Sequence, residues 1–275
     1  MKPALSIILF TTIAGAAQGM VVALALATLA GIAPATALAP MLWAATGMLL
    51  VALVASFFHL GHPLRAWRTV LMWRTSWMSR EVIVLPAFIA LVGGWALLAT
   101  LAQRDAVAPH WLAGMAIVGA VLLWYCTAMI YACIRFIQEW AHPLTVVNYT
   151  TLGLASGFVT AGALAVMAGE PGFASDIAPW ALAATALVMG FAHGANDTAN
   201  IAAPLTIMLE SIAADARAPR GTLVLLVASI GIALGIVLFG RRLVHMVGSN
   251  ITRLNPSRAL CVSPATAITV LGFSS

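Results

Sequence analysis

Three side chains with complementary chemistry lie between the second and third apolar segments of the chain. His59 ends one apolar run, Arg65 follows a break that contains Gly61 and Pro63, and Glu81 begins the next run. At a membrane surface, such groups can hold the oxygens of a quinol and take up its protons, because His and carboxylate side chains titrate. The alternative is a simpler role, in which the charges anchor the loop at the cytoplasmic surface.

A second polar constellation lies in the stretch GFAHGANDTANIAAPL. It contains Asn196, Asp197 and Asn200, with Thr198 as a weaker candidate, and Gly194 permits a sharp turn beside them. If the chain breaks here into two short helices, one carboxylate, two amides and freed backbone carbonyls form a cage for Na⁺. The N-termini of such half-helices attract an anion. An Asp within a membrane is costly and favours a binding site, whereas a polar surface loop is the alternative.

The composition places both constellations in a membrane protein. The 275 residues are 63% hydrophobic and 8% charged, whereas soluble domains carry about 25% charged residues. The net charge of +5 comes from arginines at the ends of apolar runs, so it indicates membrane orientation and not nucleic-acid binding. We therefore predict an all-α, multi-pass helix bundle in the inner (plasma) membrane of the cell.

Long apolar segments set the expected architecture. Five are long enough to span about 30 Å of hydrocarbon, at 4–30, 40–58, 82–101, 111–137 and 145–167. Two shorter pieces, 178–192 and 199–213, each reach about 23 Å as helices. A further span, 221–240, and a final apolar piece, 259–273, follow. The sequence thus predicts about seven spanning helices plus a re-entrant helical hairpin.

Charges on alternate loops predict the orientation and a division of the chain. One side of the membrane receives Lys2, Arg65, Arg68, Arg74, Arg80 and Arg135, and the other receives Arg104, Asp105, Glu170 and Asp176. The first side is predicted to be cytoplasmic because positive loops stay inside. The Gly/Pro break at 169–172 is the strongest candidate boundary, and it divides the chain into 1–172 and 173–275.

Ligands for a metal or haem are not grouped in the sequence. Cys126, Cys133 and Cys261 form neither a CxxC motif nor a cluster with His. None of the six His residues lies in the middle of an expected spanning helix, where a haem with two His ligands needs them. We therefore expect no metal site, haem or iron–sulfur cluster in this chain.

Residues 1–168 resemble the membrane anchor subunit of the dimethyl sulfoxide reductase family. The opening KPALSIILFTTIAGAAQG, the loop HLGHPLRAWR, the helix start SREV and the stretch NYTTLGLASG carry the likeness. It implies a non-catalytic anchor of anaerobic electron transport that exchanges electrons with menaquinol or ubiquinol. It also implies an iron–sulfur partner subunit and a molybdopterin catalytic subunit. His59, Arg65 and Glu81 occupy the positions of that family's quinol-site residues.

Residues 185–270 resemble the inorganic phosphate transporter family. The GANDTAN stretch and GIALGIVLFGRRLVHMVGSNITRLNPSRALCVSPATAITVL carry this likeness. It implies symport of phosphate with Na⁺ or H⁺, and it assigns phosphate and cation binding to Asn196, Asp197, Asn200 and Thr198. The family has two copies of the motif and this chain has one, so a single chain is expected to form half of a transport site. The anchor is therefore the primary prediction and the phosphate transporter is the alternative.

Overall fold

A computed structural model describes residues 5–34, 36–58, 63–101, 110–137, 140–212 and 220–246. Every regular element in these ranges is a helix, which confirms the predicted all-α class. Seven helices in the described part of the chain are long and apolar enough to cross a membrane. The chain is therefore a multi-pass membrane protein. The predicted span at 259–273 and the quinol-site candidate His59 lie outside the described residues.

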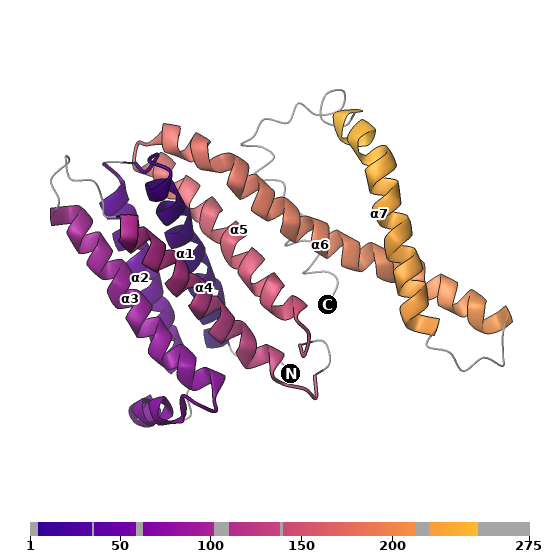
Figure 1. The fold of residues 1–275 in the computed structure, drawn as a ribbon, viewed down its shortest axis with the longest axis horizontal. Helices are drawn as coiled ribbons and strands as arrows, with labels where there is room; N and C mark the ends of the chain where they lie inside the picture. Colours follow the sequence, from indigo (N-terminus) through magenta and orange to yellow (C-terminus); the bar gives the residue numbers. More distant parts are fainter. Residues whose placement is uncertain are drawn as a thin grey trace. The chain divides into compact units, whose positions relative to one another are not determined.

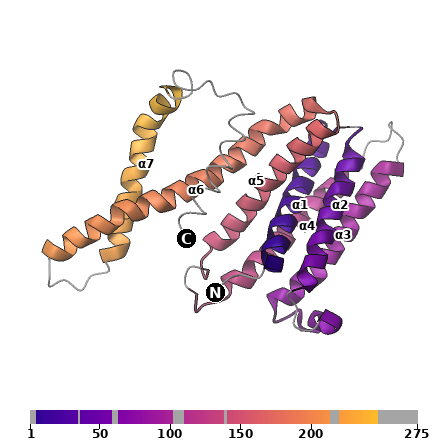
Figure 2. The ribbon, with the colours of Figure 1, turned by 180° about the vertical axis from the view of Figure 1, so that it is seen from behind.

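Five helices form a bundle that matches the five long apolar segments. They are α1 (Leu5–Leu29), α2 (Leu38–Phe57), α3 (Trp77–Leu101), α4 (His110–Ala132) and α5 (Leu144–Met167). Helices α1 to α4 contact one another in a ring, and α5 packs against α1 and α4. Figures 1 and 2 show the five helices side by side from opposite directions. A short 3₁₀ helix, η1 (Pro63–Met72), lies between α2 and α3 and contacts α3.

Helix α1 is the central helix of the bundle. Every residue from Ala17 to Ala25 is buried, whereas α2, α3 and α5 each have a strongly exposed side. Its buried stretch carries small side chains and one amide, Gln18, whose Nε2 donates a 3.0 Å hydrogen bond to the carbonyl of Ala14. Small residues suit this position, because helices in lipid associate by close van der Waals packing and not by the hydrophobic effect.

Paired glycines allow the backbones of α1 and α5 to touch. A Cβ atom added to Gly19 would lie 2.8 Å from the carbonyl carbon of Gly153 and 3.0 Å from the Cα of Gly157. Gly153 and Gly157 are four residues apart, as are Gly15 and Gly19, so each helix presents a small-xxx-small motif. The crossing therefore depends on the absence of side chains at these positions.

A tight turn separates α5 from α6 (Pro171–Ile212) at the predicted Gly/Pro break. Gly169 adopts a φ of +79° and its amide donates to Val166, while the amide of Glu170 donates to Ala165 at 2.9 Å. This is the usual helix ending with a left-handed glycine, and Pro171 then begins the next helix without an amide to satisfy. The hydroxyl of Thr36 donates to the Glu170 carboxylate across the same end of the bundle.

The predicted re-entrant hairpin is wrong for the described residues. Helix α6 is continuous for 42 residues and passes through Gly194 and the GANDTAN stretch without a break. One glycine in a helix costs about 1 kcal/mol relative to alanine, and the neighbouring Ala192, Ala195 and Ala199 are the best helix formers. Local propensity therefore outweighs the turn signal. The spanning part of this helix is Pro171–Phe191, and the last span is Leu223–Gly240 within α7 (Arg220–Met246).

The chain divides into two compact units, Met1–Ala184 and Thr185–Ser275. The first unit contains η1, α1 to α5 and the first part of α6, where Phe173, Ile177 and Ala181 are buried. The second contains the rest of α6 and α7. The functional boundary between 172 and 173 remains a prediction.

Candidate functional site

A buried carboxylate lies at the start of α3, between α3 and α4. Glu81 is 8% exposed, and Thr127 of α4 is 3% exposed. The hydroxyl of Thr127 donates a hydrogen bond to Oε1 of Glu81. A carboxylate within the apolar part of a membrane protein is costly and is expected to serve a function. We therefore take Glu81 as the centre of the candidate site.

The surroundings of Glu81 suit both of its protonation states. The Thr127 hydroxyl also lies 3.0 Å from the carbonyl oxygen of Leu123, one turn earlier in α4. When Glu81 is ionised, Thr127 can donate to it. When Glu81 is protonated, its own O–H can donate to Thr127, whose hydrogen then turns to Leu123. A group that keeps a hydrogen bond in both states can accept and release a proton without leaving an unpaired polar atom.

Two tyrosines complete a polar cluster around this carboxylate. Tyr131 lies one turn after Thr127 on α4, and Tyr149 lies on α5, which packs against α4. The Tyr149 hydroxyl oxygen is buried and has no hydrogen-bond partner among the described residues. Buried polar groups are normally paired, so an unpaired hydroxyl is a place where a ligand oxygen or a water can bind. We call Glu81, Thr127, Tyr131 and Tyr149 the Glu81 cluster.

Arginines and tryptophans next to the Glu81 cluster form a surface that we call the Arg/Trp surface, which consists of Trp73, Arg74, Trp77 and Arg80. Arg80 stacks on Trp77 with 4.0 Å between its guanidinium carbon and the ring centroid, and it donates 3.0 Å hydrogen bonds to the carbonyls of Trp73 and Arg74. Arg74 lies 5.4 Å from the ring of Trp73. Stacked aromatic and cationic groups are typical of the headgroup level of a membrane. The Glu81 cluster therefore lies at the membrane end of the bundle that carries η1.

The three predicted quinol-site residues differ in their burial and in whether the structure describes them. Glu81 is buried between α3 and α4, at the start of α3. Arg65 lies on η1 and is exposed. His59 falls outside the described residues. The structure thus supplies geometry for the carboxylate, and the roles of His59 and Arg65 remain predictions.

Sequence reasoning missed the hydroxyl groups of the cluster. Thr127, Tyr131 and Tyr149 lie in long apolar segments, where such residues are common and usually bond to their own helix. The available signal was their spacing, since Thr127 and Tyr131 are four residues apart and share one face of α4. That face could be linked to Glu81 only after α3 and α4 were known to be neighbours.

The second predicted site lies on the continuous part of α6. Asp197 and Asn200 are exposed and Thr198 is half-buried; Asn196 lies in the same helix, and its side chain lies outside the described ones. At 100° per residue, Asn196, Asp197 and Asn200 share one side of the helix, and Thr198 lies about 100° beyond Asp197. The carbonyls of an unbroken helix are used in its own hydrogen bonds. The predicted cage of freed carbonyls is therefore absent from this part of the described chain.

The sequence profile of the phosphate transporter family matches residues 7–275. The chain is also 43% identical over 187 residues to a subunit of the sulfite dehydrogenase of Allochromatium vinosum, an alignment that covers 62% of this chain and 58% of the relative. No solved structure matches the chain.

Proteins named for phosphate transport match a shorter part of the chain. A Helicobacter pylori protein that carries the name of a phosphate permease is 40% identical over 93 residues, which is 31% of this chain and 17% of the relative. Sodium-dependent phosphate transporter 1-A of Danio rerio is 34% identical over 90 residues, covering 32% of this chain and 14% of the relative. The chain thus spans less than two thirds of each of these three relatives.

Proposed function

The chain belongs to the phosphate transporter family, and we propose that its first compact unit works as the quinol-binding membrane subunit of an oxidoreductase. One observation carries this proposal, namely the buried Glu81 carboxylate hydrogen-bonded to Thr127 at the membrane end that carries the Arg/Trp surface. The likeness to a sulfite dehydrogenase subunit supports the same class of complex.

Quinol oxidation releases two protons and two electrons. Glu81 accepts one proton, because its hydrogen bond with Thr127 persists in both protonation states, and His59 is the proposed acceptor of the other. The unpaired Tyr149 hydroxyl donates to an oxygen of the quinol head. The electrons pass to an iron–sulfur partner subunit and from there to a molybdopterin catalytic subunit. Menaquinol and ubiquinol both present oxygens of this kind, and His59 and Arg65 are the proposed additional contacts.

Replacing Glu81 by Gln tests this proposal. The purified complex of the chain with its partner subunits is supplied with a reduced quinol analogue, and electron transfer to an artificial acceptor is followed. Loss of a positioned acid or base lowers turnover by about 10²-fold or more, so Glu81→Gln is expected to have that effect.

Glu170→Gln provides a matched control, because Glu170 also accepts a threonine hydrogen bond but lies at the turn between α5 and α6. Its turnover is expected to match that of the unaltered protein. Equal turnover in the Glu81→Gln complex and the unaltered complex would refute the role of Glu81. Both variants are quantified in the membrane first, so that a loss of assembly is separated from a loss of chemistry.

Phosphate binding by the second unit is the other candidate function. The family match and the phosphate transport relatives support it, and Asp197 and Asn200 lie exposed on one side of α6. Asn196 and Thr198 are the proposed neighbours in this site, with Na⁺ or H⁺ as the coupled cation. Because the chain has one copy of the motif, we propose that it forms half of a transport site.

Uptake of radioactive phosphate by a transport-deficient cell that expresses this chain alone tests this candidate. We expect uptake to stay at background, with Asp197→Asn indistinguishable from the unaltered chain. Robust uptake driven by Na⁺ or H⁺ and abolished by Asp197→Asn would instead make transport the main function of the chain.

A further inference from the structure

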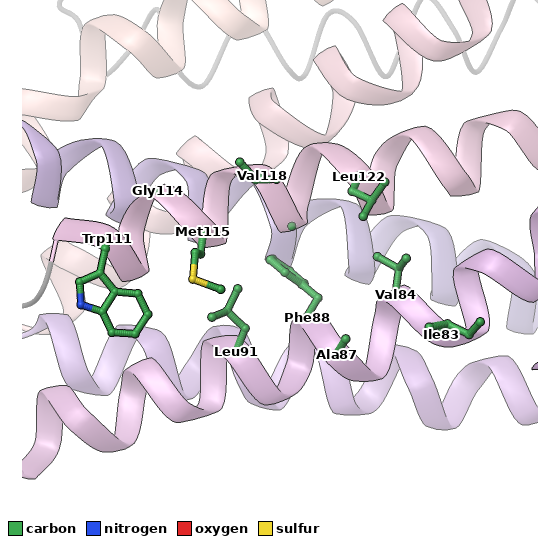
Figure 3. Close-up of a pocket in the computed structure, with 11 residues that line it drawn as sticks. Ile83, Val84, Ala87, Phe88, Leu91, Trp111, Gly114, Met115, Val118 and Leu122 are labelled. Atoms are coloured by element: carbon green, nitrogen blue, oxygen red, sulfur yellow. The ribbon is translucent and has the colours of Figure 1, made fainter.

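An apolar groove runs along the contact between α3 and α4. It has a cavity volume of about 630 Å³ and its lining is almost free of polar atoms. Figure 3 shows Trp111, Met115 and Leu91 at one end of the groove and Leu122, Val84 and Ile83 at the other. Gly114, Gly119 and Ala87 also line it, and a Cβ added to Gly114 would meet no atom within 4 Å. At 1.5 Å per residue the lining covers about 12 Å of α3 and about 16 Å of α4.

The two walls of the groove lead to the Glu81 cluster. On α3, Leu91, Phe88 and Val84 are spaced by three and four residues, and the next position on this stripe is Glu81. On α4, the stripe Trp111, Met115, Val118 and Leu122 continues to Cys126, which precedes Thr127. Thr127 in turn donates its hydrogen bond to Glu81. The groove and the buried carboxylate thus lie on the same helix–helix seam, one helical turn apart.

We propose that this groove binds the polyprenyl tail of the quinol whose head lies at the Glu81 cluster. The inference rests on the proposed quinol function and extends it to the part of the substrate that does no chemistry. A quinol head held at Glu81 must direct its tail into an apolar region. The groove starts one turn from Glu81 and runs away from the Arg/Trp surface into the hydrocarbon region.

The position of the groove next to Glu81 favours a quinone tail over a lipid chain. A phosphatidylcholine acyl chain has the same polarity, but that lipid has no hydroxyl group that could donate a hydrogen bond to the buried carboxylate. Continuity with Glu81 is what distinguishes a quinone tail from bulk lipid.

Photolabelling of the full chain in phosphatidylcholine nanodiscs tests the inference. The probe is a polyprenyl quinone with a diazirine on its tail, and two further probes carry the same diazirine on a polyprenyl chain without a head and on phosphatidylcholine. We expect the quinone probe to label peptides from 83–91 and 111–122, and excess unlabelled quinone to reduce that labelling about tenfold. Labelling by the phosphatidylcholine probe that excess quinone does not displace would assign the groove to lipid and overturn the inference.

Gly114→Leu places a larger side chain in the groove, at a position where an added Cβ meets no atom within 4 Å. It should reduce labelling by the quinone probe about fivefold or more. Gly94→Leu is the matched control, because Gly94 has the same free space on α3 but does not line the groove. Equal labelling in both variants would overturn the inference.

Labelling of the chain and quinol turnover of the complex together separate this inference from the proposed function. If the complex does not oxidise quinol while the head-free and quinone probes still label the groove, the oxidoreductase proposal fails and the tail site stands. If quinol is oxidised normally but the quinone probe labels other parts of the chain, the tail site fails and the oxidoreductase proposal stands.

Discussion

Thr127 of α4 donates a hydrogen bond to the carboxylate of Glu81 on α3, and both side chains are buried. The bond joins two helices that are 46 residues apart in sequence at this contact. The face of α4 that carries Thr127 also carries Tyr131, one helical turn later. A titratable group held in this way can exchange a proton while the helices around it keep their positions.

Removing the Tyr149 hydroxyl should weaken quinol binding. Tyr149→Phe keeps the ring and deletes only the buried oxygen that lacks a partner among the described residues. One hydrogen bond is worth about 1 kcal/mol, so the KM for quinol should rise about fivefold while folding is preserved. Steady-state turnover of the assembled complex at varied quinol concentration measures this change.

Tyr125→Phe is the control for that variant. Tyr125 also lies in the bundle, but it is 43% exposed and makes an edge-to-face contact with Trp77 through its ring. Its KM should remain unchanged. Identical KM values for Tyr149→Phe and the unaltered complex would remove Tyr149 from the site.

A methyl group at Gly19 should destabilise the bundle. It would press on the carbonyl group of Gly153, so α1 and α5 would have to separate. Overpacking of this kind costs about 1–3 kcal/mol. We expect Gly19→Ala to lower the midpoint of thermal unfolding in detergent, measured by the circular dichroism of the helices.

Gly47→Ala is the matched control, since a Cβ added to Gly47 of α2 meets no atom within 4 Å. Alanine is the better helix former of the two residues, so this variant should unfold at the same temperature or higher. A fall of equal size in both variants would show that the backbone contact between α1 and α5 is not the cause.

Because α6 is continuous, the distance between two positions on either side of the GANDTAN stretch can be predicted. Spin labels at Leu187 and Ile207, both exposed, lie 20 residues apart and should be separated by about 30 Å along one helix axis. The measurement is pulsed electron resonance on a chain whose three cysteines are replaced by serine. A hairpin that turns at 193–198 would bring the two positions together, so a short distance would contradict the continuous helix.

The side of the membrane that carries η1 is also testable. The arginine distribution predicts that this loop is cytoplasmic. In a chain without native cysteines, Thr75→Cys should therefore resist an impermeant thiol reagent in intact cells and react after lysis. Ile32→Cys, in the loop between α1 and α2, should show the opposite pattern. Reaction of Thr75→Cys in intact cells would reverse the orientation.

The spanning helices could be predicted because length and apolar composition alone define them. The five segments at 4–30 to 145–167 all form helices at the expected places. The GANDTAN stretch misled the prediction, because its polar residues were given more weight than the helix propensity of the alanines around them. The polar residues of this stretch indicate what it contacts. The helix propensity of its alanines determines whether α6 continues through it.

The candidate site could be predicted only in part. Glu81 stands out as a charge in an apolar run, so composition is enough to find it. Thr127 and Tyr149 are ordinary in spanning helices, and their relation to Glu81 depends on α3, α4 and α5 being neighbours. Helix adjacency arises from packing between segments far apart in sequence, which a local pattern does not encode.

The central position of α1 has a consequence for synthesis in the cell. Its buried stretch between Ala17 and Ala25 belongs to a helix that contacts α2, α4 and α5, and α5 ends at Met167. Helix α1 therefore enters the membrane long before its last neighbour has been translated. Until then its glycine face and the amide of Gln18 must be covered by lipid or by the insertion machinery. The bundle is thus completed around α1, which is fully enclosed only when α5 is added.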